Sequence, residues 1–310
     1  MKRRKLNKKR VALALIILII IIVAITISLI QLFKYREYLK SDEYALKKIG
    51  YNDSEIVTIL KYAEKDELNE IKNKKYTKEL VKFINQKYFI YDNLNKYIKY
   101  YKNDKTVKPS KIISLINVGA DKDFYNESKK TDISLKELML VNKFHYLDES
   151  YNPENIVDVS AQYAYDGNEV PKFVYDKYLE MWNAANEEGL YLIMTSSYRS
   201  YQYQEDLYNS YKQQKGEKWA DSVAARAGFS EHQTGYALDI VTYNSTMDDF
   251  EESDEFKWLS KNAHKFGFIL RYPKGKEDIT GYDYESWHYR YVGEDVAKYI
   301  YENKITFDEY

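Results

Sequence analysis

The longest apolar run of the chain lies close to its beginning. Residues 11–30 contain only two polar positions, Thr26 and Ser28. At about 1.5 Å per residue, a helix of this length spans about 30 Å, which is the thickness of the hydrocarbon core of a bilayer. A core helix of a soluble domain would show a polar face, and this run shows none. The pattern predicts a transmembrane helix over residues 11–33.

Residues 34–108 show short helical patterns instead of one continuous pattern. Apolar residues recur at helical spacing after three candidate capping residues, Asp53, Thr77 and Asp92. The polar, proline-containing stretch 103–110 predicts a domain boundary, which we place after residue 108. We expect a helical stalk that holds the rest of the protein away from the membrane. A module that binds the cell wall or a partner is the alternative.

Beyond residue 109, strand-like and helical patterns alternate irregularly. Strands are expected at 112–118, 190–195, 236–241, 268–270 and 287–292, and helices at 171–188, 201–214, 217–226 and 250–265. A regular strand–helix alternation would predict a parallel sheet, and this mixture does not show one. We therefore predict an α+β fold over residues 109–310, with a small antiparallel sheet flanked by helices.

The charge distribution orients the predicted membrane helix. Seven of the 47 basic residues lie in the first ten positions, with no acidic residue among them. The positive-inside rule then makes residues 1–10 a cytoplasmic segment and exports everything after residue 33. A cleaved secretory signal is the alternative, but the apolar run is longer than the 7–15 residues of a signal core. Both interpretations place the main body outside the cell.

Composition also limits the kind of site that the main body can hold. Outside the basic segment, the chain has 40 basic and 48 acidic residues, so a nucleic-acid-binding surface is not expected. The chain has no cysteine, which excludes disulfides, cysteine zinc sites and a cysteine nucleophile. Any metal must be bound by carboxylates and by the four histidines.

Two short segments contain residues suited to such a site. His232 and Asp239 lie seven positions apart with Gly235 between them, and His288 follows about fifty residues later. Gly235 permits a turn that brings His232 back over Asp239, which the expected strand 236–241 directs into a cleft. Two imidazoles and a carboxylate form a three-ligand set for Zn²⁺ that leaves one position for water. A structural His–Asp hydrogen bond is the alternative for the first pair.

Glu285 is the candidate general base. In a continuous strand, Glu285 and His288 would point to opposite faces, so we place Glu285 on a bend that precedes the strand. A helical turn is the alternative, because a separation of three residues then corresponds to one face. In either case the carboxylate can accept a proton from the attacking water and pass it to the leaving amine. A surface ion pair between Glu285 and Arg290 would be a purely structural role.

Arg199 is the candidate cation of the site. Its guanidinium offers five donors in a fixed plane, which suits either a developing oxyanion or a substrate carboxylate. A structural ion pair is the alternative. The remaining histidines, His145 and His264, have no acidic residue at a useful spacing and are not expected to bind metal. Tyr282 and Tyr284 could close over a substrate, but in a chain with 34 tyrosines they are not predicted to be site residues.

Four segments together resemble one known family. They are Ser230–Ile240, Glu285–Gly293, Ser196–Ser200 with Gln204, and Leu138–Lys143. Their order and spacing are similar to those of the VanY-type zinc D-alanyl-D-alanine carboxypeptidases, over roughly residues 110–300. The sequence departs from that pattern at Ala227 and Ser286, where the family usually has proline.

The resemblance implies a fold and roles for particular residues. The fold would be that of the hedgehog and D-Ala-D-Ala peptidase group, with Zn²⁺ bound by His232, Asp239 and His288. The glutamate at position 285 would be the base, and the arginine at position 199 would contact substrate near the scissile bond. The positions of Gln204 and Ser230 would line the substrate site.

We therefore expect a membrane-anchored, extracellular zinc carboxypeptidase that removes the terminal D-alanine from peptidoglycan stem peptides. Serine-type peptidase motifs are missing from the sequence, which excludes that mechanism. An L,D-carboxypeptidase or a peptidoglycan endopeptidase with the same zinc site is the alternative. In another class, a zinc-stabilised wall-binding module without catalysis is possible, but the intact Glu285 argues against it.

Overall fold

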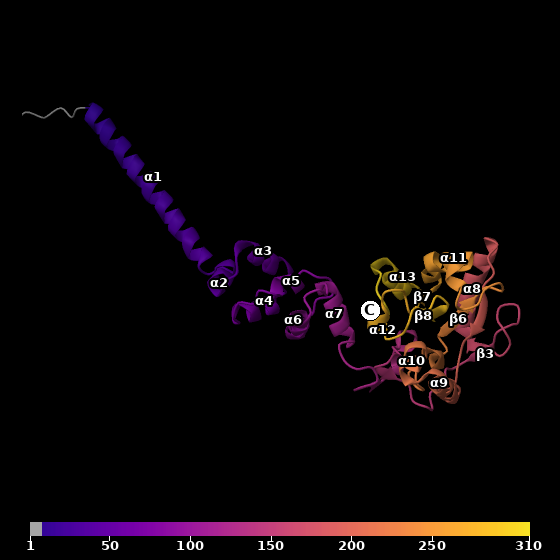
Figure 1. The fold of residues 1–310 in the computed structure, drawn as a ribbon. Helices are drawn as coiled ribbons and strands as arrows, with labels where there is room; N and C mark the ends of the chain where they lie inside the picture. The colour runs from indigo at the N-terminus through magenta and orange to yellow at the C-terminus, as the bar shows by residue number, and fades with distance from the viewer. Residues whose placement is uncertain (1–7) are drawn as a thin grey trace, which may run out of the picture. The chain divides into compact units, whose positions relative to one another are not determined.

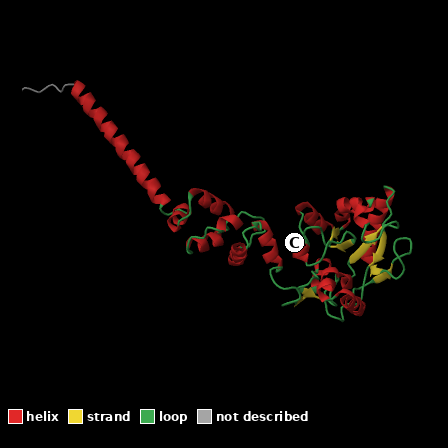
Figure 2. Cartoon of the chain, in the orientation of Figure 1, coloured by secondary structure: helices red, strands yellow, loops and turns green. Residues whose placement is uncertain are grey.

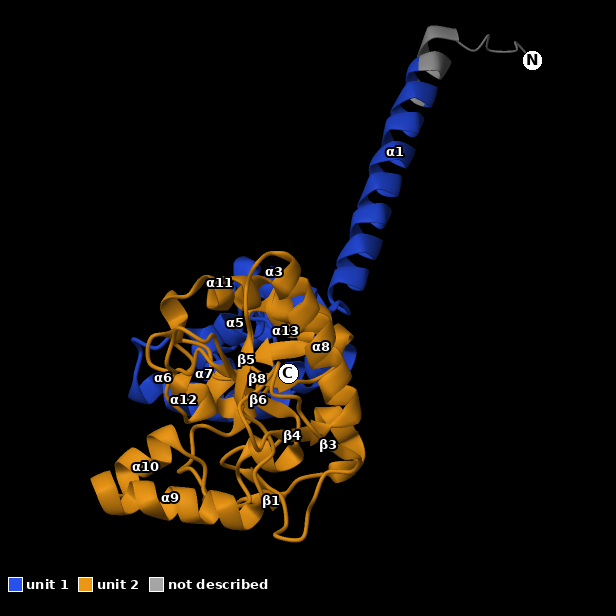
Figure 3. Ribbon diagram, turned by 90° about the vertical axis from the view of Figure 1, so that its right-hand side faces the viewer, with its two compact units in different colours: residues 1–113 blue, residues 114–310 orange. Residues whose placement is uncertain are grey.

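The computed structural model describes residues 8–310, so most of the predicted cytoplasmic segment 1–10 lies outside the described residues. The chain divides into two compact units, Met1–Ile113 and Ser114–Tyr310. Figure 3 shows the two units in different colours.

The first unit begins with a long helix, α1 (Lys8–Tyr38). Its part from Leu15 to Tyr38 is long and apolar enough to cross a membrane. Figure 1 shows α1 as one continuous helix, and its apolar side chains from Leu15 to Phe33 are exposed. A helix that is apolar on all sides has no polar face to present to water, which fits the prediction of a membrane segment.

The rest of the first unit is helical, as predicted. Its elements are α2 (Asp42–Ile49), α3 (Asp53–Tyr62), α4 (Lys65–Lys72), α5 (Leu80–Phe83), η1 (Tyr91–Asn93) and α6 (Leu94–Asn103). The cap of α3 is Asn52 and not Asp53, because the Asn52 side chain accepts from Glu55 N while the Glu55 carboxylate accepts from Asn52 N. A small core that includes Leu46, Ile59 and Leu80 holds these helices together.

One sequence prediction in this region is wrong. Residues 112–118 form no strand but belong to a helix, α7 (Pro109–Val118). The isoleucines suggested a strand, yet the buried positions Ile112, Ile113, Leu115 and Ile116 follow helical spacing. Pro109 suits the first turn, and Gly119 (φ 83°) ends the helix.

The second unit is built on a four-stranded antiparallel sheet in the order β5-β6-β8-β7. Its strands are β5 (Ile193–Ser196), β6 (Ala237–Val241), β7 (Phe268–Leu270) and β8 (His288–Tyr291). Two small pairs accompany it: β1 (Lys129–Lys130) with β2 (His145–Tyr146), and β3 (Ile156–Asp158) with β4 (Glu169–Pro171). Helices surround the strands in Figure 2, so the predicted α+β fold is confirmed.

The helices of this unit are α8 (Lys172–Glu187), α9 (Tyr201–Lys215), α10 (Glu217–Val223), α11 (Asp254–Asn262), α12 (Glu277–Thr280) and α13 (Glu294–Asn303). Helix α8 contributes the predicted face of Val174, Tyr178 and Met181 to the core that also contains Leu238 and Ile240 of β6. Strand β6 is buried along its whole length. A side chain on β6 is therefore attached to a well-packed, rigid backbone.

The long helix expected at 250–265 is divided into three pieces. They are η4 (Phe250–Glu252), α11 and η5 (Ala263–Phe266). Ser253 separates the first two, because its hydroxyl accepts from Phe256 N and so caps α11. The short helices η2 (Ile133–Leu138) and η3 (Glu231–Thr234) complete the unit.

Candidate metal centre

Two neighbouring strands bring Asp239 and His288 together. They are direct partners in the antiparallel pair β6–β8. Directly paired residues of antiparallel strands project to the same face, with their Cβ atoms about 5 Å apart. Residues separated by about fifty positions in the sequence are thus adjacent in the sheet.

His232 reaches the same face through a tight turn. It lies in η3, where the Ser230 hydroxyl accepts from His232 N, and Gly235 follows in the left-handed conformation at φ 76°. A Cβ atom at Gly235 would lie 2.8 Å from Cδ of Pro171 and 3.1 Å from Cγ of Pro153. The left-handed conformation confirms the predicted turn at Gly235, and the nearby prolines are a second reason, not predicted from the sequence, why this position requires glycine.

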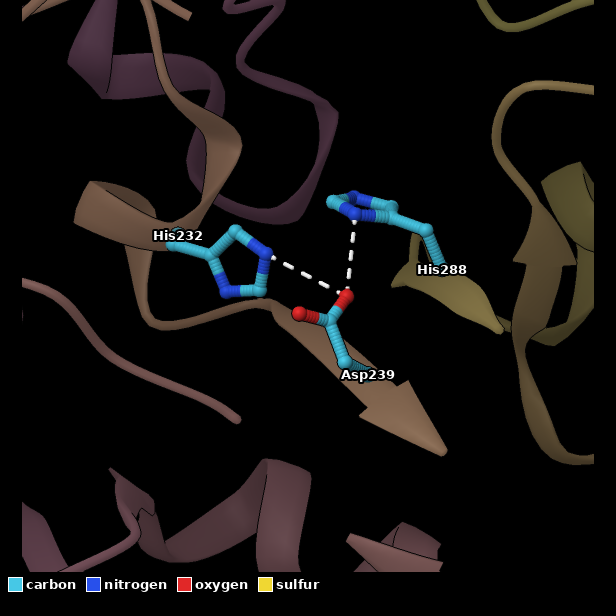
Figure 4. A group of neighbouring side chains, drawn as sticks. All are labelled: His232, Asp239 and His288. Atoms are coloured by element: carbon cyan, nitrogen blue, oxygen red, sulfur yellow. Dashed lines mark ion pairs between the residues drawn. The ribbon is translucent and has the colours of Figure 1, made fainter. Parts of the chain in front are cut away.

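The three side chains converge on one oxygen atom. His232 Nε2 lies 3.4 Å and His288 Nδ1 lies 3.2 Å from Oδ1 of Asp239. Figure 4 shows both contacts meeting at that oxygen. One ligand atom from each of the three residues lies within 4.8 Å of the others, and all three residues are buried.

This arrangement fits a tetrahedral metal ion. Ligands at about 2.1 Å from a tetrahedral zinc lie about 3.4 Å from one another. Asp239 Oδ1 is buried and has no hydrogen-bond partner among the described residues. The other nitrogen of His232, Nδ1, lies 2.6 Å from the carbonyl oxygen of Ser197. Because a carbonyl only accepts, Nδ1 carries the hydrogen, and Nε2 presents its lone pair to the centre.

At neutral pH, Asp239 is ionised and His232 is neutral, which are the forms that bind a cation. Burial opposes the charge of Asp239, but His232, His288 and Arg199 outweigh it and hold the pKa of Asp239 well below its usual range. Burial and Arg199 lower the pKa of His232 to about 4. For His288, burial is outweighed by contacts with Asp239 and Glu231, which raise its pKa to about 9. A divalent cation would compete with the proton for Nδ1 of His288.

Glu285 stands beside this group. As predicted, it lies on the irregular segment before β8, and its Oε2 is 3.4 Å from His288 Nδ1. Its side chain is 14% exposed, and burial raises its pKa to about 7. It makes no ion pair with Arg290, because Arg290 contacts Glu231. A carboxyl group with a pKa near neutrality is suited to accept and return a proton.

Arg199 holds the carboxylate of Asp239 from the other side. Its Nη2 lies 2.8 Å from Oδ2 of Asp239, and its Nε donates to the hydroxyl of Ser196. Its Nη1 lies 3.3 Å from the side-chain oxygen of Gln204. The ion pair considered as a structural alternative therefore exists, and it leaves Oδ1 of Asp239 free to face the histidines.

A cavity of about 180 Å³ adjoins the group. Arg199, Gln204, Ser230 and Glu285 line it, together with all three candidate ligands. Gln204 is fixed by its amide, which donates to the carbonyl of Ala225. Of the two tyrosines considered from the sequence, Tyr282 lines the cavity, whereas the ring of Tyr284 contacts Lys274.

One residue next to His288, Glu231, was not predicted from the sequence. Glu231 is completely buried, and its Oε1 contacts both Arg271 (2.8 Å) and Arg290 (2.9 Å). The position of Glu231 next to His232 was the available signal, but no pattern showed that its side chain points toward His288. His145 and His264 lie away from the group: His145 contacts Asn142, and His264 stacks on Tyr301.

Comparisons with known proteins show similarity to carboxypeptidases. A family model described as VanY, D-alanyl-D-alanine carboxypeptidase, matches residues 167–294. The putative carboxypeptidase YodJ of Bacillus subtilis (strain 168) is 39% identical over 206 residues, which cover 61% of this chain and 74% of YodJ. A D-alanyl-D-alanine carboxypeptidase of Enterococcus faecalis (strain ATCC 700802 / V583) is 31% identical over 182 residues, covering 56% of this chain and 65% of that protein.

A solved structure of the LdcB LD-carboxypeptidase is also similar to this chain. It superimposes with a TM-score of 0.56 and is 37% identical, covering 59% of this chain and 89% of that one. The matched family region contains all seven residues that were predicted from the sequence to form the site.

Proposed function

The chain belongs to the VanY family of D-alanyl-D-alanine carboxypeptidases, and from this premise we propose that it is a membrane-anchored zinc D,D-carboxypeptidase. Its substrates would be peptidoglycan stem peptides that end in D-alanine. The observation that carries the proposal is the convergence of His232 Nε2 and His288 Nδ1 on an Asp239 oxygen without any other partner in the described structure.

His232, Asp239 and His288 would hold the metal. Bound Zn²⁺ supplies a Lewis acid that polarises a carbonyl and lowers the pKa of water from 15.7 to about 7. Oε2 of Glu285 would accept a proton from the water that attacks the carbonyl carbon of the peptide bond. As the C–N bond breaks, Glu285 would deliver this proton to the leaving D-alanine amine. Because its side chain is only 14% exposed, few competing water molecules reach it.

Arg199 would contact both the candidate metal ligand Asp239 and the substrate. Its contact with Oδ2 fixes the rotation of the Asp239 carboxylate. The guanidinium has five N–H donors, and Ser196, Gln204 and Asp239 use three of them. The remaining two are available for a substrate oxygen in the cavity, either of the scissile carbonyl or of the terminal carboxylate. Gln204 and Ser230 would line the same substrate site.

The similarity to an LD-carboxypeptidase supports a second candidate with the same centre. In that case the substrate would be a tetrapeptide, in which the residue before the terminal D-alanine has the L configuration. The catalytic groups would act in the same way, and the difference would lie in how the cavity walls accept the residue before the scissile bond.

The decisive experiment uses the full-length protein in detergent with a stem pentapeptide and, separately, a tetrapeptide. Mass spectrometry follows the loss of alanine with and without a chelator. Loss of one alanine from the pentapeptide alone, abolished by the chelator, supports the D,D-carboxypeptidase. Cleavage of the tetrapeptide alone supports the L,D-carboxypeptidase, and chelator-resistant cleavage would contradict the metal mechanism.

The membrane anchor is a separate part of the proposal. Helix α1 would cross the bilayer once, with the basic residues 1–10 in the cytoplasm and the second unit outside the cell. Proteolysis of intact protoplasts tests this orientation. We expect an external protease to digest the second unit while an epitope at the N-terminus stays protected, and the reverse result would contradict it.

A further inference from the structure

A buried network of charges lies behind His288. It consists of two acids and two arginines: Glu231, Arg271, Arg290 and Asp308. The side chains of Glu231, Arg271 and Arg290 are fully buried, and that of Asp308 is 2% exposed. Buried charges are costly to desolvate, and they stabilise a fold no better than well-packed apolar side chains do. A network of this size therefore calls for a reason beyond stability.

The two oxygens of Glu231 have different surroundings. Oε1 accepts hydrogen bonds from both arginines, from Nε of Arg271 at 2.8 Å and from Nη1 of Arg290 at 2.9 Å. Oε2 faces Nε2 of His288 at 3.6 Å. Neither Oε2 nor Nε2 has a hydrogen-bond partner among the described residues. Since buried polar atoms are rarely left unpaired, a small rotation that joins these two satisfies both.

This pairing decides which nitrogen of His288 is available. A carboxylate only accepts, so a hydrogen bond to Glu231 places the ring hydrogen on Nε2. The lone pair then lies on Nδ1, the atom 3.2 Å from Oδ1 of Asp239. Carboxylates that accept from a ligand histidine in this way fix the orientation of its ring and raise its basicity.

The network reaches the end of the chain. Arg271 pairs with both oxygens of Asp308, Nη1 with Oδ2 at 2.5 Å and Nη2 with Oδ1 at 3.1 Å. Asn142 donates to the same carboxylate at 2.8 Å. Arg290 is fixed independently, because its Nη2 donates to the carbonyls of Glu137 and Met139. Asp308 thus restrains the arginine that restrains Glu231.

We propose that Glu231 is a positioning residue that orients His288 for metal binding, and that Asp308 of the C-terminal segment anchors it through Arg271. The inference rests on the proposed metal centre and adds to it a remote determinant of metal affinity. The Glu231 carboxylate is fully buried and faces the two arginines and His288, and Asp308 does not line the cavity, so both residues would act through His288.

The variants are made in the full-length protein. Glu231→Gln keeps the size of the side chain but, with Oε1 held by the arginines, turns an amide N–H₂ toward Nε2 of His288. Asp308→Asn weakens the anchor without a change in volume. Glu309→Gln is the matched control: Glu309 is also a buried C-terminal carboxylate, but it contacts Lys276, Ser114 and Thr306 instead of the network.

Zinc affinity, measured by competition with a chromogenic chelator, is the main measurement. We expect Glu231→Gln to weaken zinc binding about 10- to 100-fold, as is typical for the loss of such a partner. Asp308→Asn should show a smaller loss in the same direction, and Glu309→Gln should bind zinc within about twofold of wild type. Equal affinity of Asp308→Asn and Glu309→Gln would overturn the role of Asp308, and this comparison decides that role even if Glu231→Gln does not fold.

A spectroscopic measurement separates positioning from general stability. In zinc-loaded protein with ¹⁵N-labelled histidine, the four histidines give few resonances, which single substitutions assign. We expect His288 to carry its hydrogen on Nε2, with a downfield proton that moves upfield in Glu231→Gln. A hydrogen on Nδ1 in wild type would overturn the proposal.

These readouts do not use turnover, so the two hypotheses can fail separately. If wild type binds zinc as described but cleaves neither peptide, the proposed function fails and the positioning role stands. If wild type cleaves peptide and Glu231→Gln retains both its zinc affinity and its Nε2–H resonance, the positioning role fails.

Discussion

At the scale of single residues, the two oxygens of the Asp239 carboxylate have different roles. Arg199 holds Oδ2, and Oδ1 faces both histidines. Without the guanidinium, the carboxylate would be free to rotate and to offer either oxygen. Glu285 differs, because burial is the largest cause that raises its pKa to about 7, and the charge of Asp239 raises it further.

Replacement of Glu285 by glutamine removes the proposed proton acceptor and keeps the volume of the side chain. We expect kcat to fall about 10²- to 10⁴-fold, the range that general acid–base groups usually contribute. Zinc affinity should change little, because Glu285 is not one of the three converging ligands. Steady-state kinetics together with chelator competition measure both quantities, and a variant with wild-type kcat would exclude Glu285 as the base.

Replacement of Arg199 by lysine tests the role of the guanidinium plane. A single ammonium group cannot reach Ser196, Gln204 and Asp239 together, so the Asp239 carboxylate should lose its fixed rotation. Hydrogen bonds to charged groups contribute about 1.5–3 kcal/mol, so kcat/KM should fall about 10- to 100-fold. An unchanged kcat/KM would mean that a point charge is sufficient. Lys172→Met, which removes an exposed ion pair with Asp176, is a control that should retain full activity.

At the scale of elements, the site depends on the β6–β8 register and on the turn before β6. The register pairs Asp239 with His288, and a shift of one residue would turn one of them to the opposite face. The turn at Gly235 places His232 over the same face, with prolines packed against the glycine.

Gly235→Ala should therefore damage the site more than an ordinary glycine substitution does. Gly189 is the matched control, because its φ of 80° is similar and a Cβ atom there would meet nothing within 4 Å. We expect Gly189→Ala to lower the free energy of unfolding by about 1–2 kcal/mol, the usual cost of a left-handed residue. Gly235→Ala should cost about 1–3 kcal/mol more through overpacking, and should also weaken zinc binding. Denaturant unfolding and chelator competition measure these effects, and equal losses in the two variants would contradict the packing argument.

At the scale of the whole molecule, the metal is expected to stabilise only one of the two units. All three candidate ligands belong to the unit Ser114–Tyr310. A ligand that binds only the folded state stabilises it by about 2.7 kcal/mol when present at 100 times its Kd.

Chelation should therefore lower the melting temperature of that unit and leave the helical region of residues 34–108 unaffected. Circular dichroism cannot separate the two units, so hydrogen exchange followed by mass spectrometry is the appropriate measurement. We expect peptides from β6 and β8 to lose protection on chelation while peptides from α2 to α6 keep theirs. Equal loss of protection in both regions would show that the metal acts on the whole chain.

The sequence by itself determined the fold class and the family, and it predicted which residues form the candidate site. Apolar run length, strand-period patterns and the motifs around His232 and His288 are local properties, and local properties can be read along a chain. The same approach failed at residues 112–118, where the β-branched residues suggested a strand but their spacing fits the helix that is found.

Only the tertiary structure decided which atoms of these residues face one another. It showed that Arg199 holds Oδ2 of Asp239, that Nδ1 of His288 faces Oδ1, and that Glu231 and Asp308 lie behind His288. The physical reason is distance along the chain: these contacts join residues 37 to 59 positions apart through strand register and side-chain rotation. Neither the strand register nor the side-chain rotation can be read from the spacing of residues in a sequence.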